Sequence, residues 1–303
     1  AVARTFLVSE AAMGRRLSRA KRRLRESEAS FELPRGEEFA DRLEDVLAVI
    51  YLLFNEGYLP RDSSALITVE ACEEAIYLGR VVAGLLDGDT GARRAEPLGL
   101  LALMILTHSR RLARVGPEGL PVLLDEQDRA AWIDAEAREG LALLDRAIAC
   151  RAPGPYQLKA AIAALHHTAV DAEDTDWEQI HALYEKLYSY EPTPVVRLNG
   201  AVALGMWKGP EAALEALGAR GPRPDETSPP AASDTTRQPG AELSRDLADY
   251  PYYHLAVARF LEAVERIDEA QAALARAAAT STNEAERRFV GHRIDELSRR
   301  RAR

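Results

Sequence analysis

Apolar residues recur at spacings of three and four along almost the whole chain, and short loops rich in Gly, Pro and Asp separate these stretches. Such spacing places the apolar side chains on one face of an α-helix. Alanine and leucine recur throughout, whereas β-branched runs are rare, which favours helices over sheets. The sequence therefore predicts an all-α protein. Helices are expected at residues 39–54, 68–86, 97–114, 128–149, 156–169, 177–188, 194–208, 210–217, 252–264, 267–280 and from 283 to the C-terminus.

The size and composition of the chain limit where it works. With 303 residues, 47% of them hydrophobic, it can bury one large core or two. Cys72 and Cys150 lie in helix-like apolar stretches, which predicts buried, reduced thiols. No secretory signal opens the chain, and its longest apolar run, residues 46–54, is too short to span a bilayer. We therefore expect a cytoplasmic protein with no membrane partner.

Positive charge is concentrated in the first 25 residues, which contain eight Lys and Arg side chains and one acid, Glu10. The whole chain carries a net charge of −9, so the remainder is strongly acidic. A protein that binds duplex DNA gathers its positive charge on one surface. The split suggests a part that reads nucleic acid, attached to an acidic protein.

A partial helix-turn-helix accounts for this basic segment. Residues 1–6 are expected to end a short helix, Leu7 and Val8 to form a turn, and Ser9 to cap a second helix that runs to about Arg25. One face of the second helix is apolar and the rest is basic, as in a DNA-reading helix. The apolar face comprises Ala12, Met13, Leu17, Ala20 and Leu24. The alternative is a helical-repeat scaffold whose basic helix docks on an acidic protein and has no DNA role.

Two segments without apolar periodicity divide the chain. Residues 26–40 contain Pro34, Gly36 and several acids, and they are expected to separate the DNA-binding part, residues 1–30, from a helical domain, residues 31–303. Residues 220–240 are rich in Pro, Ser and Thr. We expect a disordered insertion there, between two helices.

Helix pairs recur toward the C-terminus. In residues 252–279, Ala258, Ala270 and Ala277 lie where two antiparallel helices must pack closely, a spacing that resembles a tetratricopeptide repeat (TPR) of ~34 residues. Glu265 occupies the position of the usual Gly between the helices, so the repeat is degenerate. Residues 194–217 form a weaker version. Stacked pairs create a concave surface, which usually binds a protein or peptide partner.

A set of polar residues follows or interrupts the most apolar stretches. If the set converges, its acids and arginines are expected to pair in a buried network. Three interpretations are open: caps and ion pairs that fix the packing, a ligand or protein pocket, or a catalytic acid pair. The first is the default, because two carboxylates without a recognisable partner are poor evidence for an enzyme. The set comprises Asn55, Glu56, Arg80, Asp125, Asp128 and Arg129, with Arg110, Arg111 and Trp132 nearby in the sequence.

Other chemistry is not indicated by the sequence. The six histidines are not placed with acids or thiols at metal-ligand spacings, and adjacent His166 and His167 point to different sides of a helix. The chain has no Gly-rich phosphate loop and no GxSxG elbow. Asp176 or Thr175 is expected to cap the helix that begins at Trp177. We expect no enzyme activity, no metal and no cofactor.

The segment FLVSEAAMGRRLSRAKRRL (residues 6–24) resembles the recognition end of region 4 in extracytoplasmic-function (ECF) sigma factors of RNA polymerase. The stretches that follow resemble the subgroup with a long TPR-like C-terminal extension. They are AVIYLLFNEGY (48–58), EAIYLGR (74–80), GLLALMIL (99–106), LLDEQDR (123–129), GPYQLKAAIA (154–163) and EDTDW (173–177). The resemblance covers nearly the whole chain, and the combination is more specific than either half.

The resemblance implies that the basic helix reads a promoter −35 element in the major groove. Gly14 departs from the family, which often has a polar or basic residue there. Promoter DNA and the RNA polymerase core are the implied partners, and the helical extension would modulate sigma activity. By matching positions, Glu10, Gly14, Arg15 and Arg16 would face base edges, and Ser9, Arg19, Arg22 and Arg23 would hold phosphates.

Part of the family pattern is missing from this chain. Nothing in it resembles region 2, which binds the polymerase and melts the −10 element, and only part of region 4 is present. The first residue is not Met, and the chain begins inside a predicted helix. We therefore expect the chain to be the C-terminal portion of a sigma factor.

Overall fold

The computed structural model describes residues 9–26, 37–59, 67–88, 91–116, 118–219 and 239–301. Within these ranges the regular elements are thirteen α-helices, α2 to α14, and two 3₁₀ turns, η1 and η2, together with one isolated β-bridge between Val115 and Pro121. The predicted all-α fold is confirmed. None of the described helices is both long enough and apolar enough to cross a membrane.

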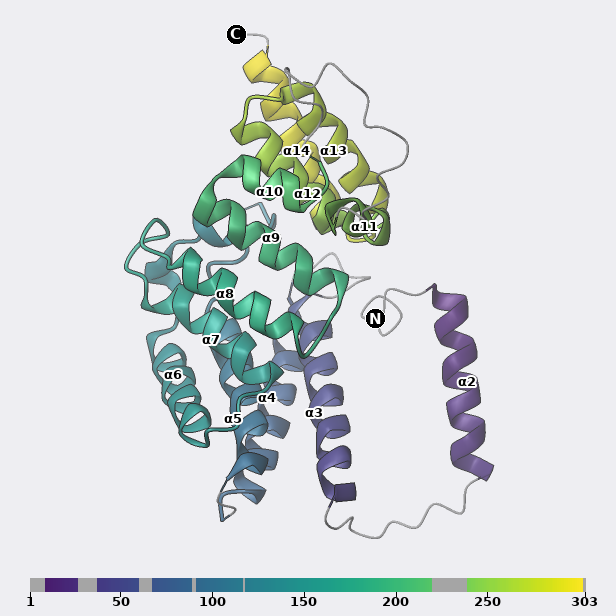
Figure 1. Cartoon of the computed structure of the whole chain (residues 1–303), viewed down its shortest axis with the longest axis vertical. Coiled ribbons are helices and arrows are strands. Elements are labelled where there is room, and N and C mark those ends of the chain that lie inside the picture. Colours follow the sequence, from purple (N-terminus) through teal and green to yellow (C-terminus); the bar gives the residue numbers. More distant parts are fainter. Residues whose placement is uncertain are drawn as a thin grey trace.

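The helices follow one another along the long axis of the molecule, and α2 (Glu10–Glu26) stands apart from this stack (Figure 1). The first group comprises α3 (Glu37–Tyr58), α4 (Val69–Leu85), α5 (Ala92–His108), α6 (Asp134–Ala149) and α7 (Pro155–Thr168). The second comprises α8 (Trp177–Tyr188), α9 (Pro194–Lys208), α10 (Pro210–Ala216), α11 (Pro239–Asp246), α12 (Pro251–Ala263), α13 (Ile267–Thr280) and α14 (Glu284–Arg301).

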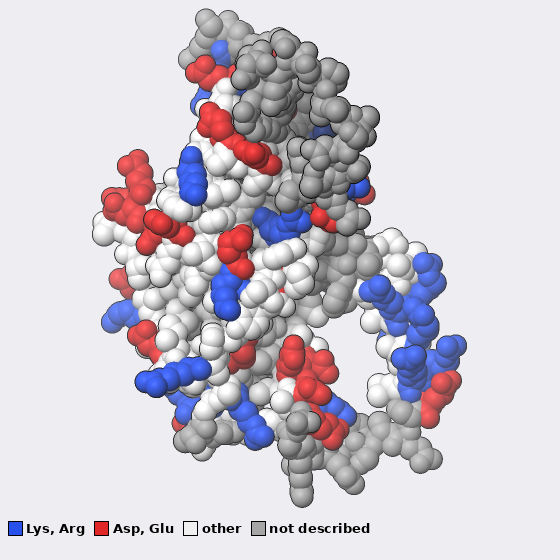
Figure 2. Space-filling view, in the orientation of Figure 1, with Lys and Arg blue, Asp and Glu red and all other residues white. Residues whose placement is uncertain are grey.

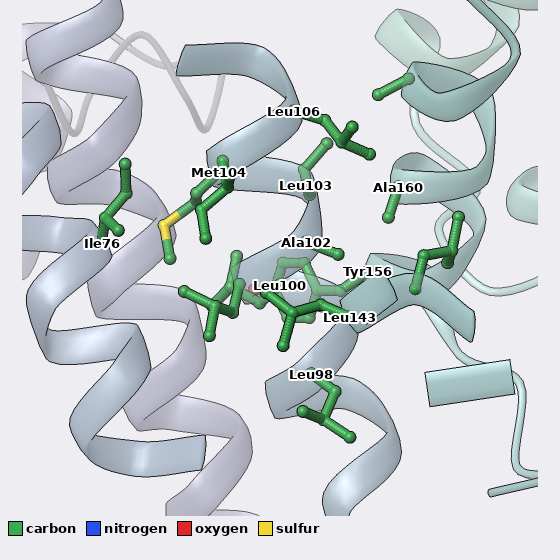
Figure 3. Close-up of a cluster of buried hydrophobic side chains, with 14 of the residues drawn as sticks. Ile76, Leu98, Leu100, Ala102, Leu103, Met104, Leu106, Leu143, Tyr156 and Ala160 are labelled. Atoms are coloured by element: carbon green, nitrogen blue, oxygen red, sulfur yellow. The ribbon is translucent and has the colours of Figure 1, made fainter. Parts of the chain in front are cut away.

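The centre of the first group is α5, which is apolar on nearly all sides. Twelve of its 17 residues are buried, including all of residues 98–106. A helix of this kind is stable in water only when other helices cover it. Ile76 of α4, Leu143 of α6 and Tyr156 of α7 belong to the same core around α5 (Figure 3). The neighbours of α5 thus supply the cover that its sequence demands.

Two glycines let other helices approach α5 closely. A Cβ added at Gly99 would lie 2.8 Å from the backbone nitrogen of Gln157 on α7. A Cβ added at Gly140 of α6 would lie 2.6 Å from the Leu106 side chain of α5. Distances below 3.0 Å are not seen for real Cβ atoms, so a larger residue at either position would push the helices apart.

A second core forms around α12 and α13. Ala258, Ala270 and Ala277, the small residues predicted to allow close packing of these two helices, are all buried there. The turn between the helices places Glu265 at φ 60°, in the left-handed region that favours glycine. The N–H of Arg266 donates to the Leu261 carbonyl at 2.9 Å, so α12 ends in a Schellman motif without glycine. Glu265, which occupies the position of the usual inter-helix Gly, therefore has a backbone conformation that favours Gly.

Local signals fix most helix starts. Pro occupies the first positions of α7, α9, α10 and α12, where its missing N–H has no intrahelical partner to lose. Asp176 caps α8 by accepting a hydrogen bond from the N–H of Gln179 at 2.9 Å, which confirms one of the two predicted caps. Thr193 caps α9 through the N–H of Val196 at 3.3 Å.

The predicted limits of α5 are wrong at both ends. The helix begins at Ala92, and Pro97 lies in its second turn, where one backbone hydrogen bond is lost. It ends at His108 instead of residue 114. The hydroxyl of Ser109 donates to the Leu106 carbonyl at 2.8 Å, a side-chain bond that competes with continuation of the helix.

Two further predictions need correction. Residues 128–133, predicted as helix, instead contain η2 (Arg129–Ala131), and the N–H of Ile133 donates to the Ser109 carbonyl at 2.9 Å before α6 begins. The disordered insertion expected at residues 220–240 is wrong for its last two residues, because α11 begins at Pro239. Leu243 of α11 and Leu247 just after it are buried in the second core. Other predictions lie outside the described residues: the short helix and turn at 1–8, most of the linker at 27–36, and residues 220–238.

Candidate functional site

The basic helix α2 forms where the sequence predicts it. The Oγ of Ser9 accepts a hydrogen bond from the N–H of Ala12 at 3.2 Å, and the carbonyl of Ser9 accepts one from Met13 at 2.9 Å. Arg23 and Arg25 lie in the last turn, where positive charge suits the helix dipole. The predicted cap at Ser9 is confirmed, and local interactions favour this helix at both ends.

The side chains predicted to contact DNA lie on the surface of α2. The helix contains seven basic and two acidic residues, and Figure 2 shows the Lys and Arg side chains gathered along it, away from the mixed charges of the main body. Arg22 also pairs with Glu26 at 3.8 Å. Ser9, Gly14, Arg15, Arg16, Arg19, Arg22 and Arg23 are all exposed, and the side chain of Glu10 lies outside the described part.

The apolar face of α2 is only partly covered. Met13 is buried, whereas Leu17 and Leu24 remain 45% and 67% exposed. An amphipathic helix usually gains most of its stability by burying such a face. Much of this face is therefore exposed in the described structure.

The members of the polar set are divided among separate contacts. Asp125, in η1 (Leu124–Glu126), pairs with Arg259 of α12 through two hydrogen bonds of 2.6 and 3.3 Å. Arg129 donates to two backbone carbonyls at the end of α7, those of His166 and Ala169. Burial would raise the pKa of Asp125, but the hydrogen bonds and charge of Arg259 outweigh it and hold that pKa below its usual value.

The remaining members of the set lie elsewhere. Arg80 of α4 pairs with Glu139 of α6 through bonds of 2.9 and 3.0 Å, and both side chains are largely exposed. Asp128 accepts a hydrogen bond from the N–H of Ala130 at 3.0 Å and caps η2. The set does not converge, so the condition for a single buried network is not met. Caps and ion pairs, the default interpretation, account for these residues and for Asp125 and Arg129.

Asn55 and Glu56 are half-buried in the last turns of α3. Their neighbour Tyr58 makes a long-range contact: Arg114 lies 3.6 Å from the centre of its ring and donates to its carbonyl. The segment is thus joined to the chain that follows α5, rather than to Arg80 or Asp125.

A cavity of about 220 Å³ lies beside the Asp125–Arg259 pair. It opens where the connection between α5 and α6 meets α7, α8, α9 and α12. Apolar side chains form much of its wall, among them Leu124, Trp177, Ile180, Val202 and Met206. The polar side chains that line it are Asp125, Arg129, His166, Thr175, Tyr184, Asn199 and Arg259.

Charged and titratable groups give the cavity a positive wall. Two guanidinium groups line it against one carboxylate. Burial, together with the nearby charges of Arg110 and Arg129, lowers the pKa of His166 to about 3, so the ring is neutral at pH 7. Burial also raises the pKa of Tyr184 to about 12, which keeps its phenol protonated. The cavity wall is therefore positive although the whole chain is acidic.

Sequence reasoning found Asp125 and Arg129 but missed the other side of this cavity. Arg259, Met206 and Asn199 come from helices treated only as repeat units. A signal was present for Arg259, which is the one charged residue in the apolar run PYYHLAVARFL (residues 251–261). A lone arginine in such a run needs a partner, and here the partner is 134 residues away in the sequence.

Buried polar contacts elsewhere have structural explanations. The Oγ of Ser109 lies 2.9 Å from the Nε2 of His167, which resembles a nucleophile and its base. Ser109 is fully buried, however, and its hydroxyl also donates to the Leu106 carbonyl. This contact therefore joins the end of α5 to α7.

Cysteines and other metal-ligating side chains are dispersed over the part of the chain that the structure describes. Both cysteines are free; Cys72 is buried as predicted, whereas Cys150 is only half-buried. Burial raises the pKa of the Cys72 thiol to about 11. Among the residues that the structure describes, no group of three or more His, Cys, Asp or Glu side chains could hold a metal ion.

Comparison with known proteins gives one family match and one relative. Residues 42–148, from α3 to α6, match a family of unknown function (DUF6596). The chain is also 40% identical over 297 residues to an uncharacterized protein of Rhizobium meliloti (strain 1021). That alignment covers 98% of this chain and 64% of the relative, so the chain spans less than two thirds of the relative's length. No solved structure matches the chain.

Proposed function

We propose that this chain is the C-terminal portion of an ECF sigma factor that acts in the cytoplasm. In this proposal α2 contacts the promoter −35 element, and the helical body regulates the activity of the sigma factor on RNA polymerase. The observation that carries the proposal is α2 itself, a capped basic helix that stands apart from the body and exposes its arginines.

The arrangement of side chains on α2 supports a role in the major groove. Arg15, Arg19 and Arg22 follow one another at spacings of four and three, so they lie on one face of the helix. The apolar residues Leu17 and Leu24 lie on the other side. A helix of this width fits the major groove, where Arg can bind guanine edges and phosphates. Arg15 and Arg16 are assigned to bases, and Arg19, Arg22 and Arg23 to phosphates.

The paired helices of the body support a regulatory role. α9 packs on α10, and α12 packs on α13, in the manner of stacked helix pairs. We assign these two pairs as degenerate TPR-like units, whose surface binds a protein or peptide partner. Glu265 at a left-handed position fits this assignment, because a helical-repeat turn commonly needs Gly there.

A triple substitution tests the DNA assignment. Arg15→Ala, Arg16→Ala and Arg19→Ala together should abolish promoter-dependent transcription by the full-length protein. Stability should not change, because all three side chains are exposed and Ala is a good helix former. The matched control replaces three exposed arginines of the body, Arg42, Arg138 and Arg146, and removes the same charge. Unchanged transcription from the first variant would refute the assignment.

The rival function is a scaffold whose basic helix docks on an acidic protein. The partly exposed apolar face of α2 is the observation that favours it. Binding to promoter DNA and random DNA, measured over a series of salt concentrations, separates the two. A promoter reader should prefer its site by about 10³-fold or more, whereas a docking helix should bind both DNAs weakly and equally. Each lost phosphate contact should reduce the salt slope by about 0.9.

A further inference from the structure

The cavity between η1 and α12 has the size and wall of a small-molecule site. Its volume, about 220 Å³, exceeds the roughly 150 Å³ that accommodates benzene and lies below the roughly 300 Å³ of sites for drug-sized ligands. Val202 and Met206 of α9 and Trp177 of α8 give it apolar walls. A ligand with a body a little larger than a benzene ring would fit.

Charge inside the cavity favours an anion. Arg259 reaches Asp125 from the opposite wall, and its Nη2 also lies 3.4 Å from the sulfur of Met206. Arg129 donates to the backbone carbonyl oxygens of His166 and Ala169, while the charges of Asp171 and Asp174 act on it from the loop after α7. Within the cavity wall itself, Asp125 alone opposes two guanidinium groups.

We propose that this cavity binds a small organic acid with an apolar body, whose carboxylate pairs with Arg259 in competition with Asp125. Asp125 lies in the connection between α5 and α6, and Arg259 lies on α12. Ligand binding would therefore replace a contact that joins the first helix group to the second. The proposal does not depend on DNA binding by α2.

Three probes of one shape test the chemistry: phenylacetate, its neutral analogue phenylacetamide, and the cation phenethylamine. Binding to the full chain is followed by ligand-observed NMR and by tryptophan fluorescence, because Trp177 lines the cavity. Phenylacetate should bind at least about tenfold more tightly than the other two, since it alone offers a carboxylate to a guanidinium.

Substitutions then locate the site. Asp125→Asn removes the competing carboxylate and should tighten phenylacetate binding by about tenfold, whereas Arg259→Met should weaken it by about tenfold. Val202→Trp should abolish binding by filling the cavity. Arg80→Met is the matched control, because it breaks a two-bond ion pair of similar geometry on α4 and should leave binding unchanged. Thermal unfolding of each variant verifies that it is folded.

Several results would overturn the proposal. Equal binding of phenylacetate and phenylacetamide would show that charge has no role. If phenethylamine bound more tightly than phenylacetate, and Asp125→Asn removed that binding, the cavity would be a cation site. Failure of every probe to bind both the wild-type chain and Asp125→Asn at millimolar concentration would show that the cavity is only a packing defect. The Asp125→Asn and Val202→Trp results stand even if Arg259→Met does not fold.

Discussion

α2 and α5 are helices of the same length, 17 residues, in opposite surroundings. Twelve residues of α5 are buried, whereas Met13 is the one buried residue among the described side chains of α2. α5 owes its stability to the helices packed around it, while α2 depends on its Ser9 cap, its helix propensity and charges that suit its C-terminal end.

This difference separates the residues that build the molecule from those free to bind a partner. On α5 almost any change alters packing, so its sequence is constrained by volume. On α2 the exposed side chains touch little else in the described chain, so their charge can serve recognition. A chain with both kinds of helix can change what α2 binds without changing how the body folds.

The largest expected difference comes from truncating one leucine on each helix. Leu100→Ala on α5 should lower the free energy of unfolding by about 2–5 kcal/mol, because a fully buried side chain leaves a cavity. Leu24→Ala on α2 should change it by less than about 0.5 kcal/mol, since that leucine is exposed. Urea unfolding of both variants measures the two values. Equal losses would mean that α2 is packed as part of the body in solution.

Replacing one glycine on each helix by alanine should change stability by a smaller amount, with opposite signs on the two helices. Gly99→Ala should destabilise the protein by about 1–3 kcal/mol, because the added methyl group meets the backbone of α7. Gly14→Ala on α2 meets no atom within 4 Å and should stabilise that helix by about 1 kcal/mol. Hydrogen exchange of α2 amides should then slow about fivefold. Destabilisation by Gly14→Ala would show that another segment packs against this position.

The smallest change in unfolding free energy is expected from mild acid. This change concerns the body, because α2 contains no histidine that could titrate near pH 6. The pKa of His166 in the folded protein is about 3, below its ordinary value of 6.5, so the unfolded chain binds the proton more readily as the pH falls below 6.5. Stability is therefore fully present above pH 6.5 and declines below it.

Between pH 6.5 and 5.5 the contribution of His166 to unfolding free energy should fall by about 1 kcal/mol. His166→Gln removes the titrating group, so the loss measured by urea unfolding over this interval should be smaller in that variant by about the same amount. An identical loss in both proteins would mean that His166 is protonated at no cost in the folded state.

Much of the fold could be predicted from the sequence because its signals are local. The Ser9 cap of α2, the Asp176 cap of α8 and the apolar spacing of the helices each act within a few residues of where they are read. Some errors arose where a distant contact overrides the local pattern. α11 follows a segment rich in Pro and Ser, yet it is stabilised because its residue Leu243, and Leu247 just after it, are buried in the second core.

The candidate sites divide in the same way. The arginines of α2 could be identified because their charge and helical spacing are properties of one segment. The polar set of the body could not be assembled, because its partners come from other helices. Arg80 pairs with Glu139, 59 residues away, and Asp125 pairs with Arg259 rather than with a nearby arginine.

The sequence by itself determined that this chain is helical, where most of its helices lie, and that one exposed basic helix differs from everything that follows. Apolar periodicity, helix capping and charge act over a few residues, so they can be identified without knowing the fold. Only the tertiary structure decided that α5 is the centre of a core and that a cavity with a positive wall lies beside Arg259. Those features depend on which helix faces meet, and the packing between distant segments determines which faces do.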